Sequence, residues 1–171
     1  MRVFRLTVIV GILTLFVQCA SVPLTGRKQV ILLPESEMMQ MSLTSYGDFL
    51  KENKLSTRTD DTRRVKEVGT RIAAAVEAYL KSQGLEKQIE GYQWEFNLVQ
   101  SPEMNAWCMP GGKVVVYEGI LPVCENDDGL AVVMGHEIAH AIARHGNERM
   151  SQQMLIQAGS CLLYTSDLPT I

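Results

Sequence analysis

The sequence predicts an α+β fold with two amphipathic helices, a small, largely antiparallel sheet and a final hydrophobic helix. In the first half of the chain, apolar residues recur every three or four positions, the spacing of one helix face. From residue 92 they alternate with polar residues, as in a half-buried strand. An acidic, cap-forming segment then introduces the last helix.

The composition is that of a globular protein with one core. The 171 residues are 46% hydrophobic and 20% charged, with 4 Cys, which excludes collagen-like, disordered and disulfide-dense proteins. The formal net charge is -3. Because this balance provides no general attraction to nucleic acid, we expect no nucleic-acid partner.

Residues 1–18 have the proportions of a signal peptide. Arg2 and Arg5 precede an uncharged apolar run from Leu6 to Val17. This run is shorter than the roughly 20 residues of a transmembrane helix. The alternative is a buried N-terminal helix.

Cys19 follows this segment, as the lipidated cysteine does in bacterial lipoproteins. Gln18 departs from the small residue usual before that cysteine, and ordinary cleavage after Ala20 fits less well still. We therefore predict lipidation at Cys19 and a lipid-anchored tether over residues 19–34. Ala20, rather than Asp, after the cysteine points by resemblance to the outer membrane.

Two helices are expected to form a scaffold without chemistry. The first is predicted over residues 35–52, because Pro34 and the acids after it suit the free N–H groups of a first turn. The second begins at Thr59-Asp60-Asp61 and runs to about Ser82. Its apolar face is expected to contain Val65, Val68, Ile72, Val76, Tyr79 and Leu80.

Extended segments follow these helices. Trp94, Phe96 and Leu98 alternate with polar residues. Residues 105–109 and 114–117 flank the turn Pro110-Gly111-Gly112 and are predicted to form a hairpin.

Two cysteines in this part of the chain leave their pairing open. Cys108 and Cys124 could form a disulfide in an exported protein. Two small buried apolar side chains are an equally good interpretation.

All three histidines fall within ten residues on the last predicted helix. That helix is capped by residues 125–128 and is expected to continue at least to Arg144. His136, Glu137 and His140 form an H-E-x-x-H motif. Because residues four apart share a helix face, both imidazoles can reach one metal ion.

The motif indicates zinc-dependent peptide hydrolysis. Neutral imidazoles hold Zn²⁺, which lowers the pKa of a water that it binds to about 7. Glu137 lies about 100° around the helix from His136 and can accept the proton of that water. We predict His136 and His140 as metal ligands of one zinc ion per chain and Glu137 as the catalytic residue. The alternative is that the two histidines are satisfied core residues.

The third ligand that a catalytic zinc requires is not evident. Gly146 replaces the third histidine of the metzincin pattern. On a continuous helix His145 would lie about 140° from His140, and Glu148 about 12 Å along the axis unless the helix breaks near Gly146. Asp167 is a further acidic residue in the last segment of the chain.

Several motifs together resemble one family. They are Asn105-Ala106, the run from Pro110 to Leu121, and Asp128-Gly129-Leu130-Ala131 leading into the H-E-x-x-H helix. They resemble the zinc metallopeptidase family of the HtpX and CAAX prenyl-protein proteases, especially its soluble, exported BepA-like branch. Residues 19–27 are also similar to the start of lipoproteins in that branch.

This resemblance, which covers about residues 19–158, implies a zincin-like metallopeptidase core that cleaves polypeptides. It implies that the third ligand is a glutamate on a later helix, after His140 and absent from this chain. It also implies that an edge strand near Asn105 and Ala106 binds the substrate backbone. Envelope proteins of the bacterial periplasm are the expected substrates, with a role in protein quality control.

Residues 161–171 are predicted to be a non-native tail. Cys161 to Ser166 are the residues that the codons TGT CTC TTA TAC ACA TCT would encode, and that DNA resembles a transposase adapter used in library preparation. Residues 35–160 would then be the N-terminal part of a metallopeptidase domain that is incomplete at its C-terminus, and inactive as given. The alternative is a natural short C-terminus.

The predicted function is therefore that of an exported zinc metalloendopeptidase. One alternative is a non-enzymatic envelope assembly factor or chaperone that retains the fold. Another is a metal-dependent hydrolase with non-peptide substrates, which the H-E-x-x-H motif disfavours.

Overall fold

The computed structural model describes residues 19–22 and 25–166, which divide between two compact units. One unit spans Ser36–His145 and contains the main sheet. The other combines the described residues before Ser36 with those after His145. The predicted signal peptide, residues 1–18, lies outside the described residues, and so does Asp167.

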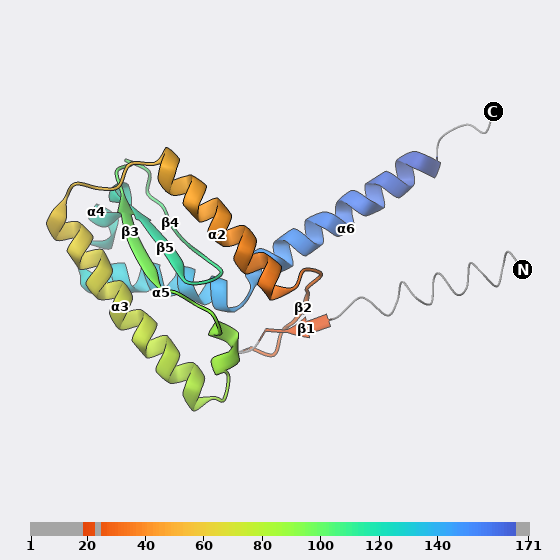
Figure 1. The fold of residues 1–171 in the computed structure, drawn as a ribbon, viewed down its shortest axis with the longest axis horizontal. Helices are drawn as coiled ribbons and strands as arrows, with labels where there is room; N and C mark the ends of the chain where they lie inside the picture. Colours follow the sequence, from red (N-terminus) through yellow and green to blue (C-terminus); the bar gives the residue numbers. More distant parts are fainter. Residues whose placement is uncertain (1–18, 23–24, 167–171) are drawn as a thin grey trace, which may run out of the picture. The chain divides into compact units, whose positions relative to one another are not determined.

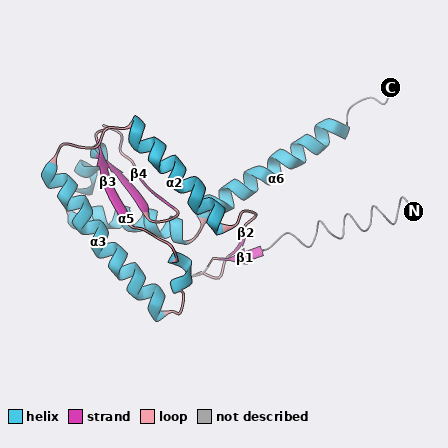
Figure 2. Ribbon diagram, viewed as in Figure 1, coloured by secondary structure: helices cyan, strands magenta, loops and turns pink. Residues whose placement is uncertain are grey.

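The Ser36–His145 unit is built around a three-stranded sheet (Figures 1 and 2). Its strands are β3 (Glu95–Val99), β4 (Ala106–Met109) and β5 (Lys113–Tyr117), in the spatial order β3-β5-β4. β4 and β5 are antiparallel, as the predicted hairpin requires, whereas β3 and β5 are parallel. The α+β class is confirmed, and the sheet is mixed rather than largely antiparallel.

β5 occupies the centre of the sheet because both of its faces are apolar. Val114 and Val116 belong to one buried cluster, and Val115 and Tyr117 belong to a second. A strand that is apolar on both faces is stable only where other elements cover both faces. The alternating pattern of the β3 segment does not show which strand of the sheet must be covered on both faces. The sequence therefore did not predict that β3 pairs with β5 in parallel.

Helices cover both faces of the sheet. α2 (Glu35–Glu52) packs on one face, where Tyr46 and Phe49 contact the cluster of Val115 and Tyr117. α3 (Thr59–Ser82) and α5 (Asp127–Ile142) contribute to the cluster on the opposite face. The bounds of α2 and α3 agree with the prediction.

α3 uses most of its predicted apolar face. Val65, Val68 and Leu80 are buried, but Tyr79 is 53% exposed. Because Tyr79 lies about 100° around the helix from Leu80, both cannot point into one narrow interface. Tyr79 is therefore not part of the core.

Short elements connect these parts and were not predicted. Two 3-10 helices cover Glu86–Ile89 and Glu118–Ile120, and α4 covers Leu121–Cys124. The turn between β4 and β5 forms as predicted, with φ of 89° at Gly111 and 81° at Gly112, values at which glycine is unstrained.

The second unit contains a β-ribbon and a helix. β1 (Cys19–Ser21) and β2 (Lys28–Val30) pair antiparallel within the predicted tether. α6 runs over His145–Ser166, so the backbone of residues 161–166 is helical. Among the described residues, no helix combines the length and apolar character needed to cross a membrane.

The packing of α3 on β3 predicts a stability effect at Gly69. A Cβ there would overlap the ring of Phe96, so Gly69→Ala must separate the helix from the strand. We expect the free energy of unfolding, measured with urea, to fall by about 1–3 kcal/mol. The matched control is Gly47→Ala in α2, where a Cβ meets nothing within 4 Å, and it should raise stability by up to about 1 kcal/mol. Equal effects of the two substitutions would contradict this packing.

Candidate metal centre

The buried face of α5 decides where the motif points. Leu130, Met134 and Ile138 are at most 1% exposed, and their four-residue spacing places them on one side of the helix. His136 and His140 each follow a buried residue by two positions, which is about 200° of rotation. The imidazoles therefore lie on the side of α5 that faces away from the core.

The start of α5 is fixed by the predicted cap. The side chain of Asn126 accepts a hydrogen bond from the backbone N–H of Gly129 at 3.0 Å, as in an N-cap. Asp127 and Asp128 follow in the first turn, where negative charge is favourable. Asp127 also pairs with Arg64 of α3 at 2.5 Å, which ties the two helices together.

His136 and His140 converge on one point. Both residues are exposed, and their Nε2 atoms lie 2.9 Å apart. This exposure argues against the alternative that they are buried core histidines. The structure thus places the two predicted ligands together on one open helix face.

This pair of nitrogens fits a zinc ion. Zn–N bonds are about 2.0–2.1 Å long, so two nitrogens in a tetrahedral site are about 3.3 Å apart. The observed 2.9 Å is close to this separation. Within the described part of the chain, no group of three or more His, Cys, Asp or Glu residues is arranged to hold a metal ion, so His136 and His140 remain two candidate ligands.

α5 ends earlier than predicted, and this changes the position of His145. The helix stops at Ile142, and Arg144 takes the left-handed conformation with φ of 59°, a common way to end a helix. The prediction of a helix that continues to Arg144 is wrong. The break brings Nδ1 of His145 to 2.7 Å from Nδ1 of His140, instead of leaving it far around a continuous helix.

The other predicted ligand candidate is engaged elsewhere. Glu148 forms a bidentate ion pair with Arg27 inside its own unit, with N–O distances of 2.5 and 2.8 Å. This pair raises the pKa of Arg27, chiefly through its hydrogen bond to Glu148.

Glu137 lies near a cysteine that the sequence did not assign to the site. Burial raises the pKa of Cys108 on β4 to about 12, and the negative charge of Glu137 adds to this effect. Cys108 and Cys124 both carry free thiols, so the alternative of a disulfide between them is not realised. The charge effect indicates that β4 runs beside Glu137.

Among the residues that the structure describes, β4 is an edge strand with no sheet partner on one side. The carbonyl of Asn105 accepts a hydrogen bond from the N–H of Tyr117 in β5, at 3.1 Å. Because backbone groups alternate sides along a strand, Ala106 and Cys108 direct theirs away from β5. Of the two predicted substrate-binding residues, Ala106 thus offers its backbone to an added strand, and Asn105 uses its carbonyl within the sheet.

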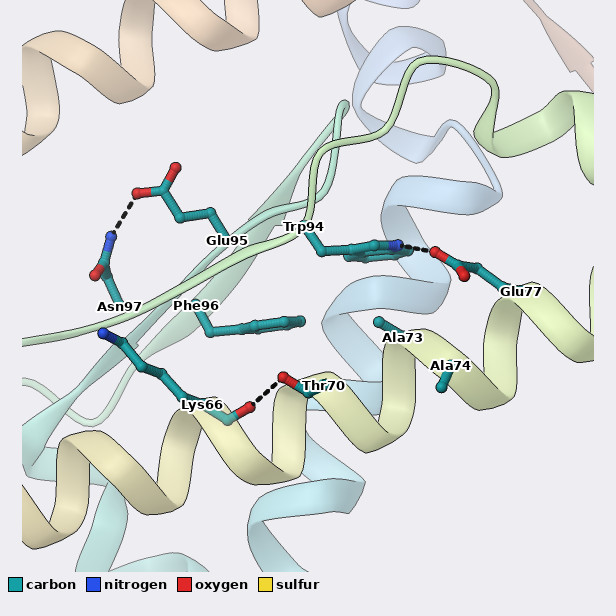
Figure 3. A pocket seen from close by; sticks show the side chains of 9 residues that line it. All are labelled: Lys66, Thr70, Ala73, Ala74, Glu77, Trp94, Glu95, Phe96 and Asn97. Atoms are coloured by element: carbon teal, nitrogen blue, oxygen red, sulfur yellow. Dashed lines mark hydrogen bonds between the residues drawn. The ribbon is translucent and has the colours of Figure 1, made fainter.

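A pocket of about 550 Å³ lies at the other edge strand, between α3 and β3 (Figure 3). Trp94 and Phe96 point into it with their ring planes 4° apart. The Nε1 atom of Trp94 donates a hydrogen bond to Glu77 at 2.7 Å. No histidine lines this pocket, so it is separate from the candidate metal centre.

A helix with exposed, convergent H-E-x-x-H imidazoles beside an edge strand defines a metallopeptidase-type core. Residues 60–168 match the model of peptidase family M48. The chain therefore belongs to peptidase family M48, which confirms the family expected from the sequence motifs.

Several relatives in this family are metalloendopeptidases by name. The chain is 46% identical over 72 residues to mitochondrial metalloendopeptidase OMA1 of Schizosaccharomyces pombe, which is 42% of this chain and 20% of that protein. It is 28% identical over 134 residues to human metalloendopeptidase OMA1, mitochondrial, covering 78% of this chain and 25% of that protein. It is 37% identical over 60 residues to the beta-barrel assembly-enhancing protease of Escherichia coli, covering 35% and 12%.

These relatives refine the expectation from the sequence. The matched region spans at most 25% of the length of each of these three proteins. The similarity to mitochondrial OMA1 proteins was not expected from the motifs, which had suggested an exported bacterial branch. Relatives of this chain are thus not confined to bacteria.

The raised pKa of Cys108 predicts low thiol reactivity. A thiol with a pKa of about 12 stays protonated near pH 8, and only the thiolate is nucleophilic. We expect iodoacetamide to modify Cys108 about a thousandfold more slowly in the folded chain than an ordinary cysteine. Mass spectrometry of the modified peptide measures this rate, and the urea-unfolded chain is the control. Rapid modification of Cys108 in the folded chain would contradict the burial that raises its pKa.

Proposed function

We propose that this protein is a zinc-dependent metalloendopeptidase, with His136 and His140 as zinc ligands and Glu137 as general base. The observation that carries the proposal is the 2.9 Å approach of the two Nε2 atoms on an exposed helix face. Membership of peptidase family M48 supports it. In this proposal the third ligand is a glutamate on a later helix, as the family resemblance implies.

The roles of the three motif residues follow from their positions. A zinc ion held by the two imidazoles would polarise the scissile carbonyl and make water nucleophilic at neutral pH. Glu137, half-buried beside His136, accepts the proton from the attacking water. It then delivers this proton to the leaving amine, which cannot depart as an anion.

The substrate class follows from the edge strand. Ala106 and Cys108 present backbone groups on the free side of β4. The negative charge of Glu137 contributes to the raised pKa of Cys108. A polypeptide that adds to β4 as a further strand would lie with its backbone next to the general base. Recognition through main-chain groups is tolerant of sequence, which suits a protease of misfolded proteins.

The mechanism predicts separate effects on zinc binding and turnover for Glu137→Gln. The variant retains both imidazoles, so the full-length gene product should keep about one zinc ion. It loses the proton acceptor, so casein hydrolysis should fall by about 10²–10⁴-fold. Metal analysis and a fluorescent casein assay measure the two properties, and His136→Ala, which should lose both, is the control.

Complementation of a deletion strain with the same variant separates the alternative function. A non-enzymatic assembly factor or chaperone would complement a deletion strain equally well as wild type or as Glu137→Gln. Undiminished hydrolysis by Glu137→Gln would instead show that another group accepts the proton.

We also propose that the protein is exported to the bacterial envelope, where Cys19 is lipidated and anchors it to the outer membrane. The support is the order of charged, apolar and cysteine residues at the start of the chain, together with the similarity to the Escherichia coli protease. Envelope proteins would then be its substrates, in protein quality control.

This localisation predicts a strict requirement for the Cys19 thiol. In a Gram-negative host, radiolabelled palmitate should enter the wild-type protein and not Cys19→Ala, and wild type should sediment with membranes. Cys124→Ala is the matched control and should label like wild type. Equal labelling of Cys19→Ala and wild type would contradict the anchor.

A further inference from the structure

We infer that His145 is a positioning residue that holds the ring of His140 in the orientation and tautomer required for metal binding. The inference rests on the proposed metal site and adds a residue outside the H-E-x-x-H motif. It starts from a line of three imidazoles, in which His140 lies between His136 and His145.

The two ring nitrogens of His140 have different neighbours. Its Nε2 atom lies 2.9 Å from Nε2 of His136, on the side where a metal ion would bind. Its Nδ1 atom lies 2.7 Å from Nδ1 of His145. His145 thus contacts the nitrogen that the metal ion would leave unused, so it is placed to orient a ligand rather than to be one.

Metal binding at His140 would determine which ring nitrogens of His140 and His145 carry protons. A neutral imidazole carries one ring proton, and the nitrogen that binds a metal must be the one without it. If Nε2 of His140 binds the ion, its proton is on Nδ1 and is donated to Nδ1 of His145. His145 must then accept at Nδ1 and carry its own proton on Nε2.

His140 needs such a partner because its side chain is exposed. Core packing does not hold an exposed ring at one angle, whereas a hydrogen bond of 2.7 Å does. Metal-ligating histidines commonly donate their second ring N–H to a fixed acceptor, and loss of that acceptor weakens metal binding by about 10–100-fold.

The end of α5 is what makes His145 a fixed acceptor. Arg144 has a φ of 59°, which interrupts the helix immediately before His145. His145 is half-buried and begins α6, and its ring centroid lies 4.9 Å from that of His140. A continuous helix could not provide this contact, since residues five apart lie about 140° from each other around the axis.

Two substitutions at His145 test the inference in the full-length gene product, which would supply the third ligand of the proposed site. His145→Leu removes the acceptor, whereas His145→Asn keeps an acceptor oxygen near the position of Nδ1. We expect the dissociation constant for Co²⁺, followed by its visible absorption, to rise about 10–100-fold in His145→Leu. It should return to within about threefold of wild type in His145→Asn. Gln152→Leu, at an exposed position of α6, is the matched control and should bind like wild type.

A second measurement reads the tautomer without any metal. In the metal-free chain, nitrogen-15 shifts of the His140 ring should show the proton on Nδ1 in wild type and in His145→Asn. The preference should be lost in His145→Leu. A purely structural role for His145 would lower thermal stability without changing which nitrogen is protonated.

The outcomes separate the two proposals. If wild type binds Co²⁺, His136→Ala does not, and His145→Leu binds as wild type does, the positioning role is overturned and the proposed metal site stands. If wild type fails to bind Co²⁺, or binds it no better than His136→Ala, the metal site and the positioning role are both overturned. Equal weakening by His145→Leu and His145→Asn would also overturn the role of the acceptor.

Discussion

The burial of one face of α5 against the sheet is the constraint on which the candidate site depends. Leu130, Met134 and Ile138 exclude water from that face, and a helix that buries one face has little freedom to rotate about its axis. The imidazoles of His136 and His140 are therefore held in the open by contacts on the opposite side. Local helix geometry brings the two rings together, and core packing points them away from the core.

The sheet contributes its edge rather than its faces to the site. β5 is covered above and below and has a strand on each side, which leaves β4 at the boundary beside α5. An edge strand presents unpaired backbone groups, which most proteins must protect from aggregation. Here Ala106 and Cys108 carry the free backbone groups, and the charge of Glu137 contributes to the raised pKa of Cys108, so strand addition would place a peptide backbone on the side of the sheet edge near Glu137.

Most of the fold could be predicted from the sequence where the signal was local. The bounds of α2 and α3 agree with prediction because helix periodicity and first-turn acids are properties of short segments. The hairpin of β4 and β5 was found for the same reason, since Pro110-Gly111-Gly112 can hardly adopt anything but a turn. The parallel pairing of β3 with β5 was missed because it depends on which strand must be covered on both faces.

The sequence by itself determined the identity of His136, Glu137 and His140 as the candidate site residues and the family to which the chain belongs. These rest on residue type and on spacing within a single helix, which tertiary contacts do not alter. Only the tertiary structure decided the place of His145. The helix before it ends at Ile142 and Arg144 follows in a left-handed conformation, and no glycine at that position marks this end in the sequence. It alone also placed Cys108 close to Glu137, since a strand that ends at Met109 and a helix that begins at Asp127 meet only through the packing of the core.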